Sequence, residues 1–184
     1  ANNCEIVRAK YKVNSSLRVL YCFETDDQQK YVSARIYAGS QARTDYFVFP
    51  NDRKIKNLDI LDSPPKWFSS CWKSSKVVAY APEKCVTVEC LDDSQNIFAY
   101  AKIYTEREFT TGEKVFRFLN EQSAKSLFPK VLGFDEKSKI LMLKKVGGSR
   151  LADLDKSQNT RAFKLLGKAI GELHETSSEV DFPE

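Results

Sequence analysis

The sequence predicts an α+β fold in which antiparallel β-hairpins come before helices. Runs rich in Val, Ile, Tyr and Phe, interrupted by acidic turns at residues 26–27 and 92–94, are typical of β-hairpins. After Tyr104 the apolar residues recur at intervals of three and four, as in amphipathic helices. The 184-residue chain is 42% apolar and 29% charged, a composition that excludes a disordered or fibrous protein.

An internal repeat organises the β-rich part. Residues 11–37 and 80–104 each run from a tyrosine through a polar loop and a β-branched strand to an Ala-basic-Ile-Tyr ending. Arg35 in the first unit therefore corresponds to Lys102 in the second. Chance similarity between two amphipathic hairpins is the alternative explanation. We expect residues 1–46 to form a β-rich N-terminal cap.

A linker is predicted at residues 47–76. Pro50 and the proline pair at 64–65 disfavour regular structure there, because proline fixes its own φ and restricts the residue before it. The aromatic residues that follow are expected to pack this linker onto a sheet; they are Trp67, Phe68 and Trp72.

A helix is predicted from Thr111 to Gln122. Thr110 is the expected N-cap, and Glu113 stands at the third helical position of a capping box. Two strands, at residues 131–134 and 139–146, should follow across a polar turn.

Gly147 and Gly148 then interrupt the backbone, and a second helix is predicted from near Thr160. This helix is expected to bury one apolar face, made of Phe163, Leu166, Ala169, Ile170 and Leu173.

The stretch from Val77 to His174 resembles the kinase-like phosphotransferases that include the aminoglycoside, choline and maltose kinases. The resemblance is carried, in this order, by FAYAKIY, a helix, SLFPKVLGF, the strand LMLKKV and the helix LLGKAIGELHE. It implies a protein-kinase-like small lobe, an antiparallel sheet with one helix, at residues 77–146. A hinge and the start of a large lobe are implied at residues 147–184, and the N-terminal region becomes a nucleotide-free cap.

Lys102 is the main candidate for binding a nucleotide. A lysine within an apolar strand is costly to bury unless an anion meets it, although a lysine on the wet face of an edge strand is the plainer interpretation. The resemblance implies that Lys102 contacts the α- and β-phosphates of ATP and that a helix glutamate orients it. Glu113 is favoured for that role, and Glu108 is the alternative if the helix begins earlier and is capped by Thr105.

The resemblance implies three further contacts to ATP. Lys84 lies in the loop that would cover the phosphates, but residues 81–85 contain no glycine, and an ordinary exposed lysine is the alternative. The segment 141–146, with Lys144 and Val146, would read the adenine edge through its backbone. Mg²⁺ is the expected second cofactor, with its ligands in a large lobe.

No catalytic residue is predicted within this chain. The His-Gly-Asp loop that the family uses in phosphoryl transfer does not follow the second helix, and the single histidine, His174, is expected to pack beside Leu173. We therefore interpret the chain as the nucleotide-binding N-terminal part of a phosphotransferase that acts on a hydroxyl of a small molecule such as a sugar or an amino alcohol. Its second helix would be covered by the large lobe or by a partner protein. The alternative is a non-catalytic binding or regulatory module that holds a partner protein.

Charge and cysteine content restrict the cellular setting. The net charge of +4 is small and evenly spread along the sequence, which argues against a nucleic-acid partner. Five cysteines without a C-x-x-C pair argue against a disulfide framework or a zinc site and favour the cytoplasm. No run of about 18 apolar residues predicts a membrane span.

Overall fold

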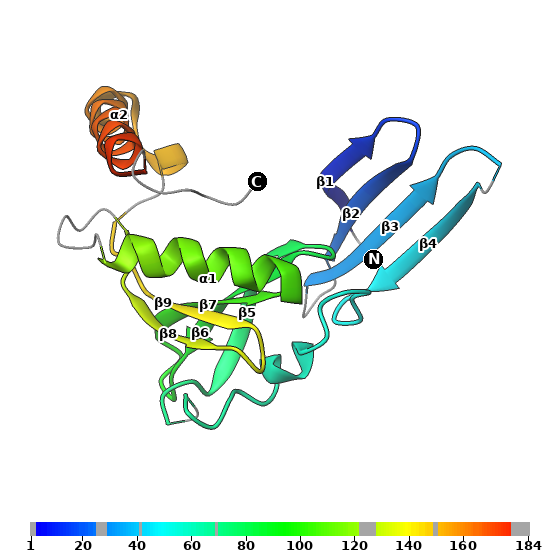
Figure 1. The fold of residues 1–184 in the computed structure, drawn as a ribbon, viewed down its shortest axis with the longest axis horizontal. Helices are drawn as coiled ribbons and strands as arrows, with labels where there is room; N and C mark the ends of the chain where they lie inside the picture. The colour runs from blue at the N-terminus through cyan, green and yellow to red at the C-terminus, as the bar shows by residue number, and fades with distance from the viewer. Residues whose placement is uncertain are drawn as a thin grey trace.

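The computed structural model describes residues 3–24, 29–40, 42–68, 70–121, 128–148 and 151–177. It is an α+β structure with two antiparallel sheets and two long helices, as the sequence predicts (Figure 1). The first sheet has the order β1-β2-β3-β4, and its strands are β1 (Asn3–Lys12), β2 (Ser16–Glu24), β3 (Gln29–Tyr37) and β4 (Arg43–Val48). The second has the order β5-β6-β7-β9-β8, and its strands are β5 (Ser74–Ala81), β6 (Cys85–Leu91), β7 (Ile97–Tyr104), β8 (Val131–Asp135) and β9 (Ile140–Lys144).

The two repeat units have the same strand pairing at their hairpins. Ser16 pairs with Tyr37 in the first unit, and Cys85 pairs with Tyr104 in the second. Two residues further in, Arg18 pairs with Arg35 and Thr87 pairs with Lys102. The correspondence of Arg35 with Lys102 therefore extends to their positions in the two sheets.

The turns that open the two units also match. Asn14 and Glu83 occupy the same place in their turns, and both have a left-handed backbone, with φ of 53° and 60°. Asparagine adopts this region more readily than glutamate does, so Glu83 stands in a conformation that its side chain disfavours. Contacts of the Glu83 carboxylate, described below, offset that cost.

One face of the second sheet joins the first sheet in a continuous core. Val86, Val88 and Ile103 on this face are fully buried and cluster with Leu20 and Tyr31 of the first sheet. The two sheets therefore contribute side chains to one hydrophobic cluster.

The predicted linker contributes to that core. Strand β4 extends to Val48 and β5 already begins at Ser74, so regular structure occupies both ends of the interval 47–76. Between them lies a short 3₁₀-helix, η1 (Leu58–Leu61). Phe68 and Trp72 are buried as expected, whereas Trp67 is 46% exposed and donates a hydrogen bond of 3.1 Å from its indole nitrogen to Asp135.

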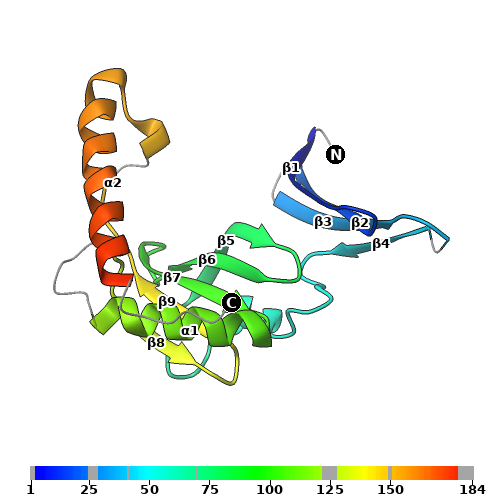
Figure 2. The same ribbon diagram turned by 45° about the horizontal axis from the view of Figure 1, so that its top comes forward.

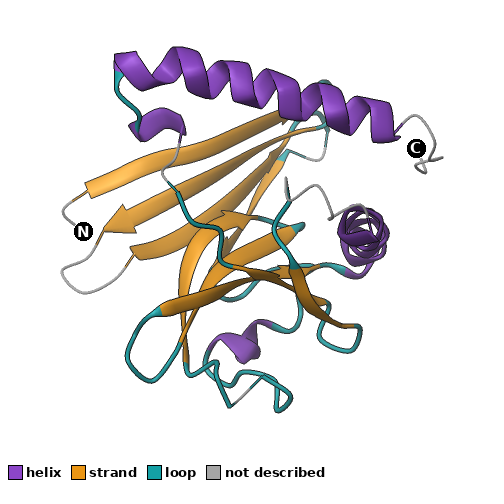
Figure 3. Cartoon of the chain, turned by 90° about the vertical axis from the view of Figure 1, so that its left-hand side faces the viewer, coloured by secondary structure: helices purple, strands orange, loops and turns teal. Residues whose placement is uncertain are grey.

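Helix α1 (Glu106–Glu121) lies across the other face of the second sheet and is seen end-on in Figure 3. It begins five residues before the predicted start, so the prediction of Thr110 as N-cap was wrong. Thr105 directly follows β7, and its hydroxyl accepts a hydrogen bond of 3.5 Å from the backbone N–H of Glu108, as a helix cap does. Thr110 lies inside the helix and donates its hydroxyl to the carbonyl of Glu106. The predicted last residue, Gln122, lies outside the described residues.

Strand β9 is shorter than predicted. It covers Ile140–Lys144 in place of residues 139–146. Its start is later because Lys139 has a left-handed φ of 55° and belongs to the turn from β8. The Asp135 carboxylate accepts hydrogen bonds from the backbone N–H groups of Lys137 and Ser138 and fixes this turn. Residues 145–148 have no regular structure, and Gly148 has a φ of +117°, which favours glycine.

After the short 3₁₀-helix η3 (Leu151–Asp153), helix α2 (Lys156–Ser177) stands apart from both sheets (Figures 1 and 2). It begins four residues before Thr160, because the Asp155 carboxylate accepts the backbone N–H of Gln158 at 2.9 Å and caps it. The predicted burial of its apolar face is not observed; the exposed fractions are 57% for Phe163, 42% for Leu166 and 45% for Ile170.

The predicted burial of α2 also involved two residues near its end, Leu173 and His174. His174 is exposed in the last turn, which does not support its predicted packing role. The side chain of Leu173 lies outside the described residues. An amphipathic pattern predicts a helix but not the element that covers it, and α2 has its apolar side chains facing solvent here.

Candidate functional site

Lys102 projects from the middle of the second sheet on the face that α1 covers. Its strand neighbours Ala101 and Ile103 point into the shared core, and its pairing partner Leu141 packs against α1. The side chain is partly buried, and the Nζ atom lies 5.2 Å from the centroid of the Tyr104 ring. In the described part of the chain no carboxylate lies within 4.0 Å of this ammonium group, so a partly buried cation is left without a counter-ion.

A small polar cluster surrounds Lys102 near the start of α1. Lys84, in the β5–β6 turn, forms an ion pair of 3.6 Å with Glu108 in the first turn of the helix. The charges of Lys102, Glu108 and Lys84 all act on the thiol of Cys85, at the beginning of β6. Of the predicted site residues, Lys84 and Lys102 therefore both lie within electrostatic range of Cys85, and Glu108 is paired with Lys84.

Burial dominates the acidity of two neutral groups in this cluster. It raises the pKa of the Cys85 thiol, although the positive charge of Lys102 acts in the opposite direction. It also raises the pKa of the Tyr104 phenol, again opposed by Lys102. Both groups are therefore neutral near pH 7 and serve as weakly polar neighbours of the ammonium group.

Glu113, the favoured helix glutamate, has a different partner. Its carboxylate lies 2.6 Å from the guanidinium of Arg117, one turn further along α1. The preference for Glu113 depended on a helix beginning at Thr111, and α1 begins at Glu106 instead. Glu108, the alternative tied to the cap at Thr105, is the helix glutamate that lies in the cluster with Lys84.

Lys144 and Val146 lie at the far end of the sheet. Lys144 is the last residue of β9, with an exposed side chain and a backbone N–H that donates to the carbonyl of Lys130 at 2.8 Å. Val146 is 61% exposed in the segment that follows. The proposed reading of adenine by this segment involves backbone groups only, and it stays a prediction.

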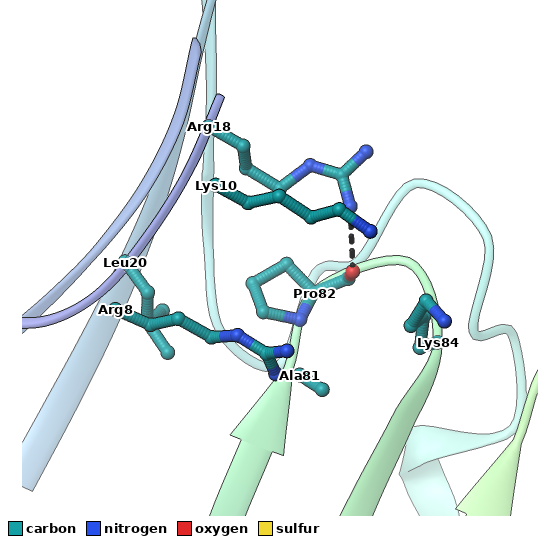
Figure 4. A pocket seen from close by; sticks show the side chains of 7 residues that line it. All are labelled: Arg8, Lys10, Arg18, Leu20, Ala81, Pro82 and Lys84. Carbon is teal, nitrogen blue, oxygen red and sulfur yellow. Dashed lines mark hydrogen bonds between the residues drawn. The ribbon is translucent and has the colours of Figure 1, made fainter. Parts of the chain in front are cut away.

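The tip of the β5–β6 hairpin is fastened to the first sheet by one acidic residue. The side chain of Glu83 is only 7% exposed, and its carboxylate lies 3.0 Å from Arg18, 3.4 Å from Arg35 and 2.8 Å from Arg53. Arg18 also donates to the carbonyl oxygen of Pro82 at 3.1 Å (Figure 4). These bonds hold the turn, with its left-handed Glu83, against strands β2 and β3.

Asp52 supports the same turn from the linker side. Its carboxylate accepts hydrogen bonds of 2.6 Å from the Tyr80 hydroxyl and 2.9 Å from the backbone N–H of Glu83, and it also accepts the N–H groups of Lys54 and Ile55. Burial acts to raise the pKa of Asp52, but these hydrogen bonds outweigh it, and the pKa lies below the usual value. Burial and the bond to Asp52 raise the pKa of Tyr80.

A cationic cleft of about 730 Å³ opens beside this turn, between the first sheet, residues 53–56 and the start of α1. The residues that line the cationic cleft are Lys10, Lys12, Ser16, Arg18, Arg35, Arg53, Lys54, Lys56, Glu83, Lys84, Thr105, Glu106, Arg107 and Glu108. Arg8 continues it on the other side of Pro82, where it lines a small pocket together with Lys10 and Arg18 (Figure 4).

Sequence reasoning missed both the role of Glu83 and the cationic cleft. Glu83 was treated only as part of a loop without glycine, and Arg35 only as the counterpart of Lys102. The repeat is the signal that could have revealed the contact between Glu83 and the arginines of the first sheet. Two matched hairpins with basic residues on one and an acidic tip on the other are candidates for pairing with each other.

No family model matches the sequence, and no curated protein or solved structure matches it either. Neither α1 nor α2, the two long helices of the described residues, has an apolar stretch of the length needed to cross a bilayer. Within the same residues, no group of three or more His, Cys, Asp or Glu side chains is placed to hold a metal ion.

Proposed function

We propose that the second sheet and α1 form the nucleotide-binding small lobe of a kinase-like phosphotransferase that uses ATP to phosphorylate a hydroxyl of a small molecule, such as a sugar or an amino alcohol. The observation that carries the proposal is Lys102, a partly buried cation on the α1 side of a mostly apolar strand with no carboxylate within 4.0 Å in the described residues. An ammonium group in such a place is stabilised when an anion such as phosphate reaches it.

The order of the strands supports the same proposal. The resemblance to the kinase-like phosphotransferases implies an antiparallel sheet with one helix, in which the helix follows the strand that carries the lysine. The second sheet here has five strands, and α1 stands between β7 and β8, its third and fourth. Likeness of fold does not establish an activity, so this order supports the proposal only together with Lys102.

The proposed roles of the other groups follow from their positions. Lys84, in the turn before β6, would add positive charge near the phosphates, and Glu108 would orient Lys84 through their ion pair. ATP would arrive with Mg²⁺, but the described residues offer no carboxylate cluster for the ion, and we assign it no ligand in this chain. We also place the protein in the cytoplasm as part of this proposal, which its five free thiols support.

Labelling with an acyl-phosphate derivative of ATP tests the proposal directly. A lysine amine near the bound phosphates attacks the acyl carbon, ATP leaves, and an amide remains on that lysine for detection by mass spectrometry. Labelling of Lys102 should be saturable and should fall at least tenfold when excess Mg·ATP competes. Lys137, an exposed lysine in the β8–β9 turn, is the internal control and should be labelled weakly and without protection. Equal labelling of Lys102 and Lys137, or labelling of Lys102 that ATP does not suppress, would overturn the proposal.

The exposed apolar side of α2 favours a second candidate function. Phe163, Leu166 and Ile170 share one side of this helix and are all at least 42% exposed. Such a surface is usual where another protein or domain packs. A non-catalytic module that holds a partner protein through α2 would give no ATP-protected labelling at Lys102, so the same experiment separates the two functions.

A further inference from the structure

The cationic cleft is lined only by polar and charged residues, and most of them are basic. Nine of its lining residues are lysine or arginine, three are glutamate, and the remaining two are Ser16 and Thr105. They come from segments far apart in the sequence: β1, β2, β3, residues 53–56, the β5–β6 turn and the beginning of α1. Like charges repel one another, and so many cations around one cavity raise the local potential for an anion.

The three carboxylates of the cleft do not neutralise it. Glu83 is bound by Arg18, Arg35 and Arg53. Glu106 forms an ion pair of 2.8 Å with Lys139, and Glu108 pairs with Lys84. All three acidic groups therefore already have basic partners.

Four of the basic groups have no such partner. Lys10, Lys12, Lys56 and Arg107 are exposed, and none has a carboxylate within 4.0 Å in the part of the chain that the structure describes. Their side chains belong to three separate parts of the fold: β1, the segment before η1, and α1. A ligand that touched all four would have to carry several negative charges within the dimensions of the cleft.

We propose that the cationic cleft is a binding site for a small ligand that carries several phosphate groups. Its volume of about 730 Å³ lies within the range of small-molecule sites. Lysine and arginine are the side chains that bind phosphate best, through charge-assisted hydrogen bonds. The start of α1 adds to this environment, since the positive end of the helix dipole is directed toward the cavity at Thr105 and Glu106.

The lining also distinguishes such a ligand from charged polymers. Proteins that bind single-stranded nucleic acid stack bases on aromatic side chains, and none of the residues lining this cavity is aromatic. Peptide sites provide apolar pockets for the side chains of the peptide, and the cleft has no large apolar side chain. Lys84 and Glu108 line the cleft and also belong to the proposed nucleotide site, but Lys102, on which that proposal depends, does not line the cleft.

Calorimetric titration of the 184-residue chain with inositol hexakisphosphate, at constant ionic strength, tests the inference. The cleft variant Lys10→Gln/Lys12→Gln/Lys56→Gln removes three unpaired ammonium groups and no ion pair. The control variant Lys76→Gln/Lys137→Gln/Lys164→Gln removes the same charge from exposed lysines outside the cleft. Circular dichroism of both variants without ligand confirms that the fold is retained.

We expect the dissociation constant to rise about threefold to tenfold for each cleft lysine that contacts phosphate, and to stay within about twofold in the control variant. Lys102→Met should bind inositol hexakisphosphate as the unaltered chain does, which separates this site from the proposed nucleotide site. Equal weakening in both triple variants would overturn the inference, because it would indicate attraction by net charge alone. Tighter binding of a single-stranded oligonucleotide or of polyglutamate than of inositol hexakisphosphate would overturn it as well, in favour of a polymeric ligand.

Discussion

The carboxylate of Glu83 lies 3.0 Å from the guanidinium of Arg18, and this contact joins residues that are 65 positions apart in the chain. Arg18 stands in β2 of the first repeat unit, and Glu83 stands at the turn of the second. A nearly buried carboxylate at the tip of one hairpin is thus held by a strand of the other, together with Arg35 and Arg53. These ion pairs hold the β5–β6 turn against the first sheet and lie in the wall of the cationic cleft.

Replacement of Glu83 by glutamine should destabilise the protein. Three guanidinium groups would lose their shared counter-charge, but they are partly exposed, so we expect the free energy of unfolding to fall by about 1–3 kcal/mol. Urea denaturation measures the change, with Glu136→Gln, an exposed glutamate in the β8–β9 turn, as the control. If both variants unfold at the midpoint of the unaltered chain, the ion pairs of Glu83 do not stabilise the fold.

Asp52 should make stability depend on pH in the acid range. Its pKa is lower in the folded protein than in the unfolded chain, where it is about 3.9, so its stabilising effect is complete above that value and is lost as the pH falls through the folded pKa. Asp52→Asn should therefore lower the Tm at pH 7, and the difference from the unaltered chain should shrink as the pH drops below about 4. Asp93→Asn, at an exposed site, is the control and should show a small difference at every pH. A Tm difference for Asp52→Asn that is the same at pH 7 and pH 3 would contradict this prediction.

Alkylation of Cys85 should report the position of the Lys102 ammonium group. The positive charge favours the thiolate, so Lys102→Met should raise the pKa of Cys85 and shift its alkylation by iodoacetamide to higher pH. Mass spectrometry of peptides gives the rate at each cysteine separately. Cys90 is an internal reference, since burial raises its pKa to about 12 and it should stay unreactive in both proteins. An unchanged pH profile at Cys85 would place Lys102 away from the α1 face.

A methyl group at Gly133 should displace Trp67. A Cβ atom there would lie 3.0 Å from the Trp67 indole, which is half-exposed and is held by its hydrogen bond to Asp135 and by ring contact with Phe68. Gly133→Ala should therefore shift the tryptophan fluorescence to longer wavelength and leave the buried Trp72 unaffected. Gly167→Ala in α2 is the matched control, because its Cβ meets nothing within 4 Å and alanine favours a helix. Identical spectra for the two variants would show that the indole does not rest on Gly133.

Local structure followed closely from local sequence in this protein. The hairpins, the repeat and the correspondence of Arg35 with Lys102 were all predictable, because β-branched runs and turn residues act over a few positions. The helix after β7 was predictable as well, but its start was not. Thr105 and Thr110 are both suitable caps, and only the end of β7 at Tyr104 decided between them.

The candidate site was predictable only in part. Lys102 could be singled out because a lysine in an apolar strand is unusual, but the choice between Glu108 and Glu113 depended on where the helix began. Nothing in the residues around Lys84 indicated that it would pair with Glu108. The exposure of the apolar side of α2 was not predictable either. An apolar stripe predicts that a helix packs against something, but it does not identify the partner.

From its sequence alone, this chain could be assigned β-hairpins, two amphipathic helices and one unusual lysine, because those features depend on neighbouring residues. The tertiary structure decided which charged side chains lie close together. The net charge of +4 looked evenly distributed along the chain, yet folding brings Lys10, Lys56 and Arg107 to one cavity and surrounds Glu83 with guanidinium groups. Electrostatic interactions depend on distance in space, and that distance is set when the two sheets pack on their shared core.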